Sequence, residues 1–174
     1  MTIREAAPTD IPSIQEIYAR HVLEGSATFE EIPPSVTEMA ERLQTVKTAG
    51  LPWLVAACGE QIYGYCYAAH YHKRSAFRYT LENSIYIRHE QRGRRIGTEL
   101  LKQLIARCEA GPWRKMIAVI GDSSNIGSIS LHRKQGFTFG GALHSAGFKH
   151  GRWVDIILME RALGEGDTTA PADR

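Results

Sequence analysis

The stretch Gln91–Thr98, which reads Q-R-G-R-R-I-G-T, has a composition suited to binding a phosphate group. It follows a predicted strand and precedes a predicted helix, whose first backbone N–H groups lack partners within the helix and attract anions. Its glycines let the backbone approach a ligand closely, and its arginines add charge-assisted hydrogen bonds. A pyrophosphate is therefore the ligand that this stretch favours. The glycine spacing matches neither the P-loop nor the dinucleotide-binding pattern, so a solvated basic turn is the alternative.

Glu82 and His132 are the residues whose types fit proton transfer. Glu82 lies in the middle of a predicted strand, where a buried carboxylate is costly unless it has a partner or a chemical task. An ion pair with Arg74 or Arg78 is the structural alternative to catalysis. His132 lies on a predicted helix, where a histidine with satisfied hydrogen bonds is the alternative to an acid or base.

A basic and aromatic segment precedes the strand that carries Glu82. Residues 70–78 read H-Y-H-K-R-S-A-F-R and show no regular hydrophobic period. If the segment is functional, it forms the rim of a pocket for an acidic substrate. The alternative is a solvated surface loop.

Hydrophobic periodicity predicts the elements that must position these residues. The predicted strands are Thr2–Glu5, Trp53–Cys58, Gln61–Ala69, Tyr79–Ile87, Met116–Ile120, and two near Phe137–Gly147 and Trp153–Glu160. Helices are predicted after Thr9 or Asp10, after the capping-box pair Ser35 and Glu38, around Leu100–Cys108, and from Asn125 to Gln135. Gly25 and Ser26 end the first helix, and a loop that contains Phe29 follows it.

The predicted strand Tyr79–Ile87 alternates between two faces. One face carries Leu81, Asn83, Ile85 and Ile87, and the other carries Thr80, Glu82, Ser84 and Tyr86. The mixed order of helices and strands points to an α/β or α+β fold around one sheet.

Composition limits the class of protein. The 174 residues fit about one domain, and 43% hydrophobic and 23% charged residues are ordinary for a globular chain. The formal net charge of +2 does not indicate a strongly basic nucleic-acid binder. The sequence shows no signal peptide, no stretch of the ~18 apolar residues that span a bilayer, and no C-x-x-C pair. We therefore expect a cytoplasmic protein with reduced thiols, a single domain over residues 1–163, and a disordered tail over residues 164–174.

Together these features resemble the GNAT superfamily of N-acetyltransferases. The likeness rests on the order of a strand with Glu82, a Q-R-x-x-x-x-G turn, an amphipathic helix, a strand, and an Asn-capped helix ending in Q-G-F. The segments T-L-E-N-S-I-Y-I, P-W-L-V-A, A-V-I-G, S-I-S-L-H-R-K-Q-G-F and A-G-F-K-H-G-R-W-V-D look like the phosphinothricin (methionine sulfoximine) N-acetyltransferase family. The resemblance extends from Ile3 to the last predicted strand.

The resemblance implies a GNAT fold of the α/β (α+β) class. Its mixed central sheet has about seven strands, is splayed between the fourth and fifth, and has helices on both faces. The implied reaction moves the acetyl group of acetyl-CoA to the amino group of a small amino-acid-like substrate, by direct attack in a ternary complex. The implied enzyme uses no metal, forms a homodimer, and binds neither nucleic acid nor a membrane.

The resemblance also assigns roles to residues. Glu82 matches the general base, and His132 matches a histidine that either protonates the leaving thiolate or orients the substrate. The acetyl-CoA contacts match Ile85, Tyr86, Ile87, Arg92, Gly93, Arg94, Arg95, Ile96, Gly97, Thr98 and Asn125. The substrate contacts match Phe29, His72, Lys73, Arg74, Phe77 and Tyr86.

Three positions depart from the family pattern. Arg95 stands where the first glycine of the turn is usual, Glu30 where relatives often carry arginine, and His72 where a lysine is seen. Two other functions compete with the leading one. The first is acetylation of a protein N-terminus or lysine, which requires an open acidic groove. The second is a non-catalytic CoA-sensing or nucleic-acid-binding module, against which the joint presence of Glu82 and His132 argues.

Overall fold

The computed structural model describes residues 1–172, and its helices lie on both faces of one seven-stranded sheet. The strands are β1 (Thr2–Glu5), β2 (Trp53–Cys58), β3 (Gln61–His70), β4 (Thr80–Ile87), β5 (Lys115–Gly121), β6 (Thr138–Lys149) and β7 (Arg152–Ala162). The α-helices are α1 (Ile11–Glu24), α2 (Val36–Thr48), α3 (Ile96–Glu109) and α4 (Ile126–Lys134). Short 3₁₀ turns are η1 (Pro8–Asp10), η2 (Ser75–Phe77) and η3 (His89–Gln91).

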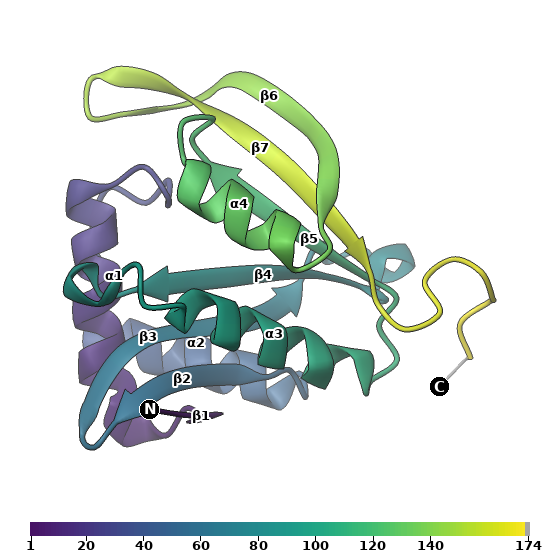
Figure 1. Cartoon of the computed structure of the whole chain (residues 1–174), viewed down its shortest axis with the longest axis horizontal. Coiled ribbons are helices and arrows are strands. Elements are labelled where there is room, and N and C mark those ends of the chain that lie inside the picture. Colours follow the sequence, from purple (N-terminus) through teal and green to yellow (C-terminus); the bar gives the residue numbers. More distant parts are fainter. Residues whose placement is uncertain (173–174) are drawn as a thin grey trace.

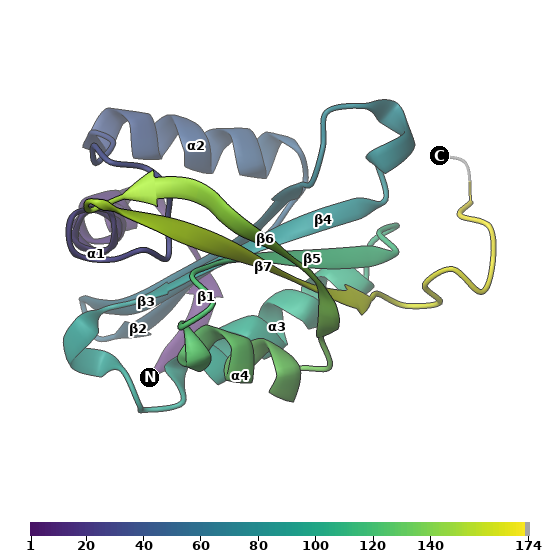
Figure 2. The same cartoon turned by 90° about the horizontal axis from the view of Figure 1, so that it is seen from above.

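The helices form two layers around the sheet. Figure 2 shows α1 and α2 on one side of the strands and α3 and α4 on the other. Trp53, Leu54 and Val55 of β2 are fully buried because helices cover this part of the sheet from both sides. This explains why β2 is an apolar run rather than an alternating strand. None of the helices within residues 1–172 is long and apolar enough to cross a lipid bilayer.

The sheet forks between its fourth and fifth strands. The strand order is β1-β2-β3-β4-β5-β7-β6, and β4 and β5 are its parallel pair (Figure 1). That pairing covers only Thr80–Asn83 and Lys115–Ala118. From Ser84 onward β4 pairs with β3 alone, while β5 continues along β7. The predicted splay of a mixed seven-stranded sheet is therefore confirmed.

Local capping signals explain where two helices begin. The Ser35 hydroxyl accepts from the N–H of Glu38, and the Glu38 carboxylate accepts from the N–H of Ser35, both at 3.1 Å. The Asn125 side chain accepts from the N–H of Ser128 at the start of α4. Both predicted caps are confirmed.

The predicted cap at Thr9 or Asp10 is wrong in its chemistry. Asp10 precedes α1, but its carboxylate does not bind the helix. It accepts two hydrogen bonds from the Arg4 guanidinium, at 2.7 and 2.9 Å, and one from the N–H of Ala7. A bidentate charged partner on β1 is stronger than a cap bond, so Asp10 ties β1 to η1 instead.

In the segment after β7, for which the sequence predicts disorder, turns and bends cover residues 164–169, and residues 170–172 have no assigned secondary structure. The Arg114 guanidinium donates to the carbonyls of Gly166 and Ala170 and to the hydroxyl of Thr169, at 3.0–3.2 Å. Residues 173–174 of that predicted tail lie outside the described residues.

Candidate active site

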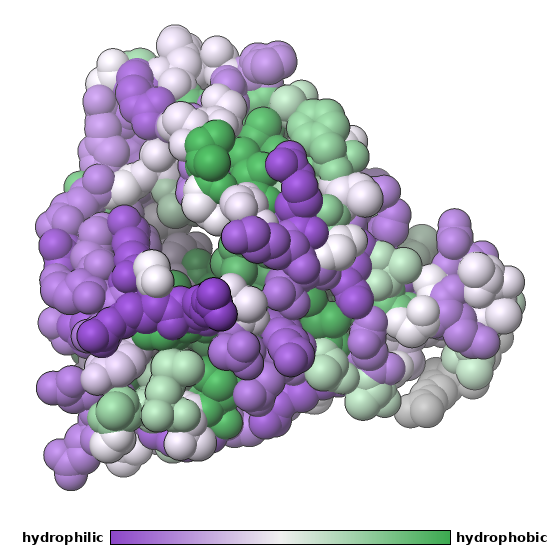
Figure 3. Space-filling view, viewed as in Figure 1, coloured by the Kyte–Doolittle hydropathy of each residue, from purple (hydrophilic) through white to green (hydrophobic). Residues whose placement is uncertain are grey.

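A cavity of about 840 Å³ opens at the fork of the sheet. Its walls come from β4, the end of β5, the first turn of α3, the length of α4, and the loop between α1 and α2. In Figure 3 the hollow beside α4 has apolar surface next to it and strongly hydrophilic side chains along its rim. The site thus combines apolar surface and a few polar side chains with a charged entrance.

Glu82 brings a carboxylate into this cavity from β4. It is half-buried, and within residues 1–172 its carboxylate has no ion-pair or hydrogen-bond partner, so the structural alternative of a pair between Glu82 and Arg74 or Arg78 is not observed. Burial raises the pKa of Glu82 above its ordinary value. A half-buried carboxylate without a partner fits a group that accepts a proton from a substrate.

His132 enters the cavity from α4 and is only 2% exposed. Its Nδ1 lies 2.8 Å from the carbonyl oxygen of Ser128, and its Nε2 lies 3.0 Å from the Oδ1 of Asn83. Phe137 packs edge-on against the ring at 5.0 Å. Burial lowers the pKa of His132, while the Ser128 carbonyl opposes that shift. The predicted alternative of a histidine with satisfied hydrogen bonds therefore describes its contacts.

The basic turn has the backbone conformation of an anion-binding loop. Gly93 has φ +76° and Arg95 has φ +62°, so two residues before α3 adopt the left-handed conformation. Arg95 makes this left-handed turn with a residue that carries a Cβ, at the cost of backbone strain. The first turn of α3, with Ile96, Gly97 and Thr98, lines the cavity. Its free N–H groups and the positive end of the helix dipole suit a pyrophosphate.

Gly97 lets α3 lie close to β4. A Cβ atom there would be 3.3 Å from Leu131 Cδ2 and 3.8 Å from side-chain carbons of Ile85 and Ile87. The absence of a side chain thus brings the first turn of α3 against β4 and α4 at the cavity wall.

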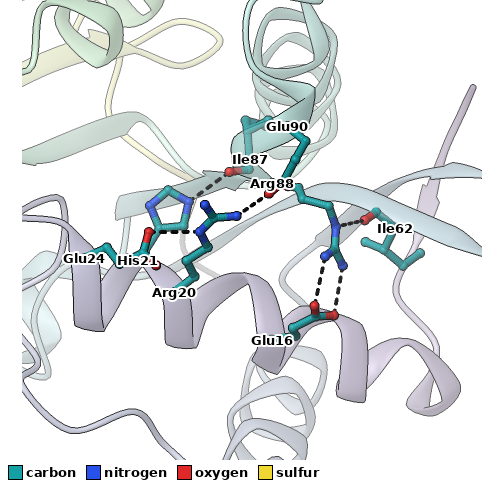
Figure 4. Close-up of polar contacts among 8 residues, drawn as sticks. All are labelled: Glu16, Arg20, His21, Glu24, Ile62, Ile87, Arg88 and Glu90. Carbon is teal, nitrogen blue, oxygen red and sulfur yellow. Dashed lines mark hydrogen bonds and ion pairs between the residues drawn. The ribbon is translucent and has the colours of Figure 1, made fainter.

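Contacts from α1 hold the segment that leads into the turn (Figure 4). His21 Nε2 lies 2.9 Å from the carbonyl oxygen of Ile87, the last residue of β4. The Arg88 guanidinium binds the Glu16 carboxylate with two bonds at 3.1 and 3.2 Å, and Arg20 pairs with Glu90. Burial lowers the pKa of His21 to about 4, so this ring is neutral at pH 7.

The loop between α1 and α2 forms the opposite wall. A Cβ atom at Gly147 would lie 2.5 Å from the Phe29 ring, and one at Gly121 would lie 3.2 Å from it. Lys149 is 2% exposed, and its ammonium donates to the carbonyl of Thr28 at 2.8 Å. The β6–β7 hairpin therefore holds Phe29 at the cavity.

The structure brings most of the predicted site residues together. The predicted residues that line the cavity are Phe29, Glu82, Ile85, Tyr86, Ile87, Arg92, Gly93, Arg95, Ile96, Gly97, Thr98, Asn125 and His132. Five do not line it. Arg94 donates to the Gln91 side chain, and His72, Lys73, Arg74 and Phe77 lie on the exposed β3–β4 loop. That loop leads directly into β4, two residues before Glu82.

Sequence reasoning missed His21, Asn83 and Lys134 as parts of the cavity wall. His21 and Asn83 carried a usable signal, because each is a polar residue on an otherwise apolar face. His21 follows Ile17 and Tyr18 at helical spacing, and Asn83 lies between Leu81 and Ile85 on one face of its strand. Lys134, at the exposed end of α4, carried none.

A forked sheet whose cavity is lined by a helix N-terminus suited to a pyrophosphate and by a half-buried carboxylate fits an acyl-CoA-type transferase. A family model described as "Acetyltransferase (GNAT) domain" matches residues 3–158, and the chain belongs to that family. It is an N-acetyltransferase that depends on acetyl-CoA.

Comparison with individual proteins shows which members of the family this chain is similar to. The chain is 52% identical over 170 residues to the phosphinothricin N-acetyltransferase of Alcaligenes faecalis, covering 98% of this chain and 86% of the relative. It is 37% identical to the L-methionine sulfoximine/L-methionine sulfone acetyltransferase of Pseudomonas aeruginosa, covering 93% of this chain and 94% of the relative. A crystal structure of a phosphinothricin acetyltransferase from Sinorhizobium meliloti with acetyl-CoA superposes with a TM-score of 0.96 at 46% identity, covering 99% of this chain and 93% of that one.

Proposed function

We propose that this chain acetylates the amino group of a small amino acid of the phosphinothricin or methionine sulfoximine type, within residues 1–163. The observation that carries the proposal is the unpartnered Glu82 carboxylate in the fork cavity. The names of the two characterised relatives support the substrate class. The attack is direct, in a ternary complex, because Cys66 and Cys108 are buried thiols whose pKa values burial raises, and Cys58 lies outside the cavity lining.

Different residues around the fork bind different parts of acetyl-CoA. Arg92, Arg95 and the first turn of α3 hold the pyrophosphate, and Asn125 shapes the start of α4 beside it. Within residues 1–172, Ser84–Ile87 of β4 have no strand partner on the β5 side, so their backbone is available to pair with the pantetheine arm. A backbone N–H in this segment donates to the thioester oxygen as it gains charge.

Proton transfer follows from the two ionisable side chains. Glu82, directly or through a water, accepts a proton from the substrate ammonium, which turns the amine into a nucleophile. The raised pKa of Glu82 brings its basicity closer to what that task requires. Collapse of the tetrahedral adduct breaks the C–S bond, and His132 gives a proton to the leaving sulfur.

The β3–β4 loop supplies the cations for the substrate's acidic group. Within residues 1–172 the side chains of Lys73 and Arg74 form no ion pair, so their charges are available. Phe29 encloses the aliphatic part of the substrate from the other wall. Recognition by the loop requires it to move toward the cavity, since none of its predicted residues lines the cavity.

Steady-state kinetics with free CoA as the readout tests this proposal. We expect acetylation of phosphinothricin and methionine sulfoximine, and a KM about tenfold higher for Arg74→Ala with unchanged acetyl-CoA affinity. The KM of Arg74→Lys should lie between those of the wild type and Arg74→Ala, because lysine is a point charge without paired donors. Lys102→Ala, on the exposed surface of α3, is the matched control. Acetylation of a peptide N-terminus in preference to both amino acids would contradict the proposal.

We also propose that the protein is a cytoplasmic homodimer, as the family resemblance implies. Its three cysteines are free, as expected of a reducing compartment. Phe148 and Trp153 of the β6–β7 hairpin are 58% and 63% exposed and contact each other at 5.3 Å, which suits burial against a second copy. Light scattering should give twice the 19.4 kDa mass of one chain, and Trp153→Glu should return it to one.

A further inference from the structure

Asn83 joins three elements at the point where the sheet forks. It is the last residue of β4 that pairs with β5. Its amide Nδ2 donates to the carbonyl of Ile117 on β5 at 3.3 Å, and its Oδ1 lies 3.0 Å from Nε2 of His132 on α4. Asn83 is 6% exposed and lines the cavity. Its side chain is thus a fixed bridge between both arms of the fork and the imidazole.

The two nearest partners of His132 are acceptors, the Ser128 carbonyl oxygen at 2.8 Å from Nδ1 and the Asn83 amide oxygen at 3.0 Å from Nε2. The Ser128 hydroxyl, which can donate or accept, lies farther from Nδ1 at 3.4 Å. The Ser128 carbonyl at Nδ1 can only accept, so Nδ1 carries a proton. Because the Asn83 Nδ2 donates to the Ile117 carbonyl, the amide oxygen is the atom that faces Nε2 of His132. An amide oxygen also only accepts, and both bonds form together only when Nε2 carries a proton too. The contacts around this ring therefore suit the imidazolium.

Charged side chains do not explain this preference. Burial and the Ser128 carbonyl are the two causes that act on the pKa of His132, and burial lowers it. Arg133 and Lys134, the neighbours on α4, are exposed, and Glu82 projects from the opposite face of β4. Neutral acceptor oxygens therefore have to offset the cost of a buried positive charge.

We propose that Asn83 is a positioning residue that keeps a proton on Nε2 of His132 at the fork. The inference rests on the proposed function, in which the Nε2 proton leaves its hydrogen bond with Asn83 Oδ1 and goes to the sulfur as the C–S bond breaks and the electron pair of that bond moves to sulfur. The imidazole is left neutral with its proton on Nδ1, still bonded to Ser128. It regains the second proton from solvent before the next turnover.

Two substitutions at Asn83 separate this role from simple packing. Asn83→Leu keeps the volume and removes the acceptor, whereas Asn83→Asp keeps an acceptor oxygen at Nε2 and adds charge. The direct readout is the pKa of His132, followed by NMR of protein with labelled histidine and assigned with a His132→Gln variant. We expect this pKa to fall by about one pH unit in Asn83→Leu and to rise in Asn83→Asp.

Kinetics supply the second readout. Asn83→Leu should lower kcat about tenfold near neutral pH with little change in the KM for acetyl-CoA, and Asn83→Asp should retain more of kcat than Asn83→Leu. A His132 pKa that is the same in all three folded proteins would overturn the proposal. So would equal losses of kcat in both variants, which packing alone would cause. The titration needs no substrate, so it stands even if the wild-type enzyme acetylates neither amino acid, an outcome that would refute only the proposed function.

Discussion

Glu82 and His132 approach the fork from opposite faces of the sheet. Glu82 shares its face of β4 with Tyr86, whose ring contacts Tyr18 and His21 of α1. His132 reaches the other face and contacts Asn83, the residue next to Glu82 in the strand. The amine and the thioester can therefore meet at the fork from two sides, with the group that accepts a proton on one side and the group that gives one on the other.

Replacing Glu82 by Gln should lower kcat by about 100-fold or more through loss of the general base. The defect should shrink at alkaline pH, where the substrate amine loses its proton without help. Wild-type activity should fall in acid with a midpoint above the ordinary pKa of a glutamate, because burial raises the pKa of Glu82. A pH–rate profile in which the loss stays constant up to alkaline pH would mark Glu82 as structural.

Replacing Gly97 by Val should weaken acetyl-CoA binding about tenfold or more while the domain stays folded. The added methyl groups would enter the space between α3, Leu131 and Ile85 and push the first turn of α3 away from the pyrophosphate. Gly97→Ala is the matched control, since the tightest contact of a single Cβ is with the flexible end of Leu131 at 3.3 Å and those with Ile85 and Ile87 are ordinary van der Waals contacts at 3.8 Å. Calorimetric titration decides, and unchanged affinity in a folded Val variant would refute the assignment of this loop.

Replacing Arg95 by Gly should separate strain from charge in the turn. The left-handed backbone at φ +62° costs an arginine about 1 kcal/mol of stability. Glycine removes this strain, but its greater conformational freedom in the unfolded chain offsets part of the gain. We expect a melting temperature equal to or a few degrees above that of the wild type, together with weaker acetyl-CoA binding. Arg95→Lys keeps a charge and the strain, so it should lose less affinity and gain no stability. A less stable Gly variant would show that the turn is not strained.

His21 should make the fold sensitive to acid. Its pKa is about 4 in the folded protein and its ordinary value is 6.5, so the unfolded chain binds the proton more tightly. Stability is then fully present above pH 6.5 and is lost as the pH falls toward 4. Chemical denaturation at several pH values should show a shallower loss in His21→Gln than in the wild type. The pH dependence of the stability of His132→Gln serves as a comparison, because burial lowers the pKa of His132 as well.

The sequence alone predicted the features that depend on residues close together in the chain. The capping box at Ser35, the Asn125 cap, the alternation along β4 and the basic turn before α3 each depend on residues close in the chain. Such patterns act over one turn of helix or a few strand residues, and the structure has them where they were predicted. The predicted site residues that line the cavity lie on these elements or match the family's motifs.

Tertiary structure decided the contacts between distant segments. The motif A-G-F-K-H-G-R-W-V-D identified a family, but only packing shows that Gly147 makes room for Phe29 and that Lys149 binds Thr28, more than a hundred residues away. Packing also placed His21 in the cavity wall and left Arg74 outside it. No pattern within one segment specifies such pairs, because they depend on how the sheet and its helices fit together. The two nearest acceptor oxygens of His132 come from β4 and α4, so the hydrogen-bond environment of this ring is a property of the fold.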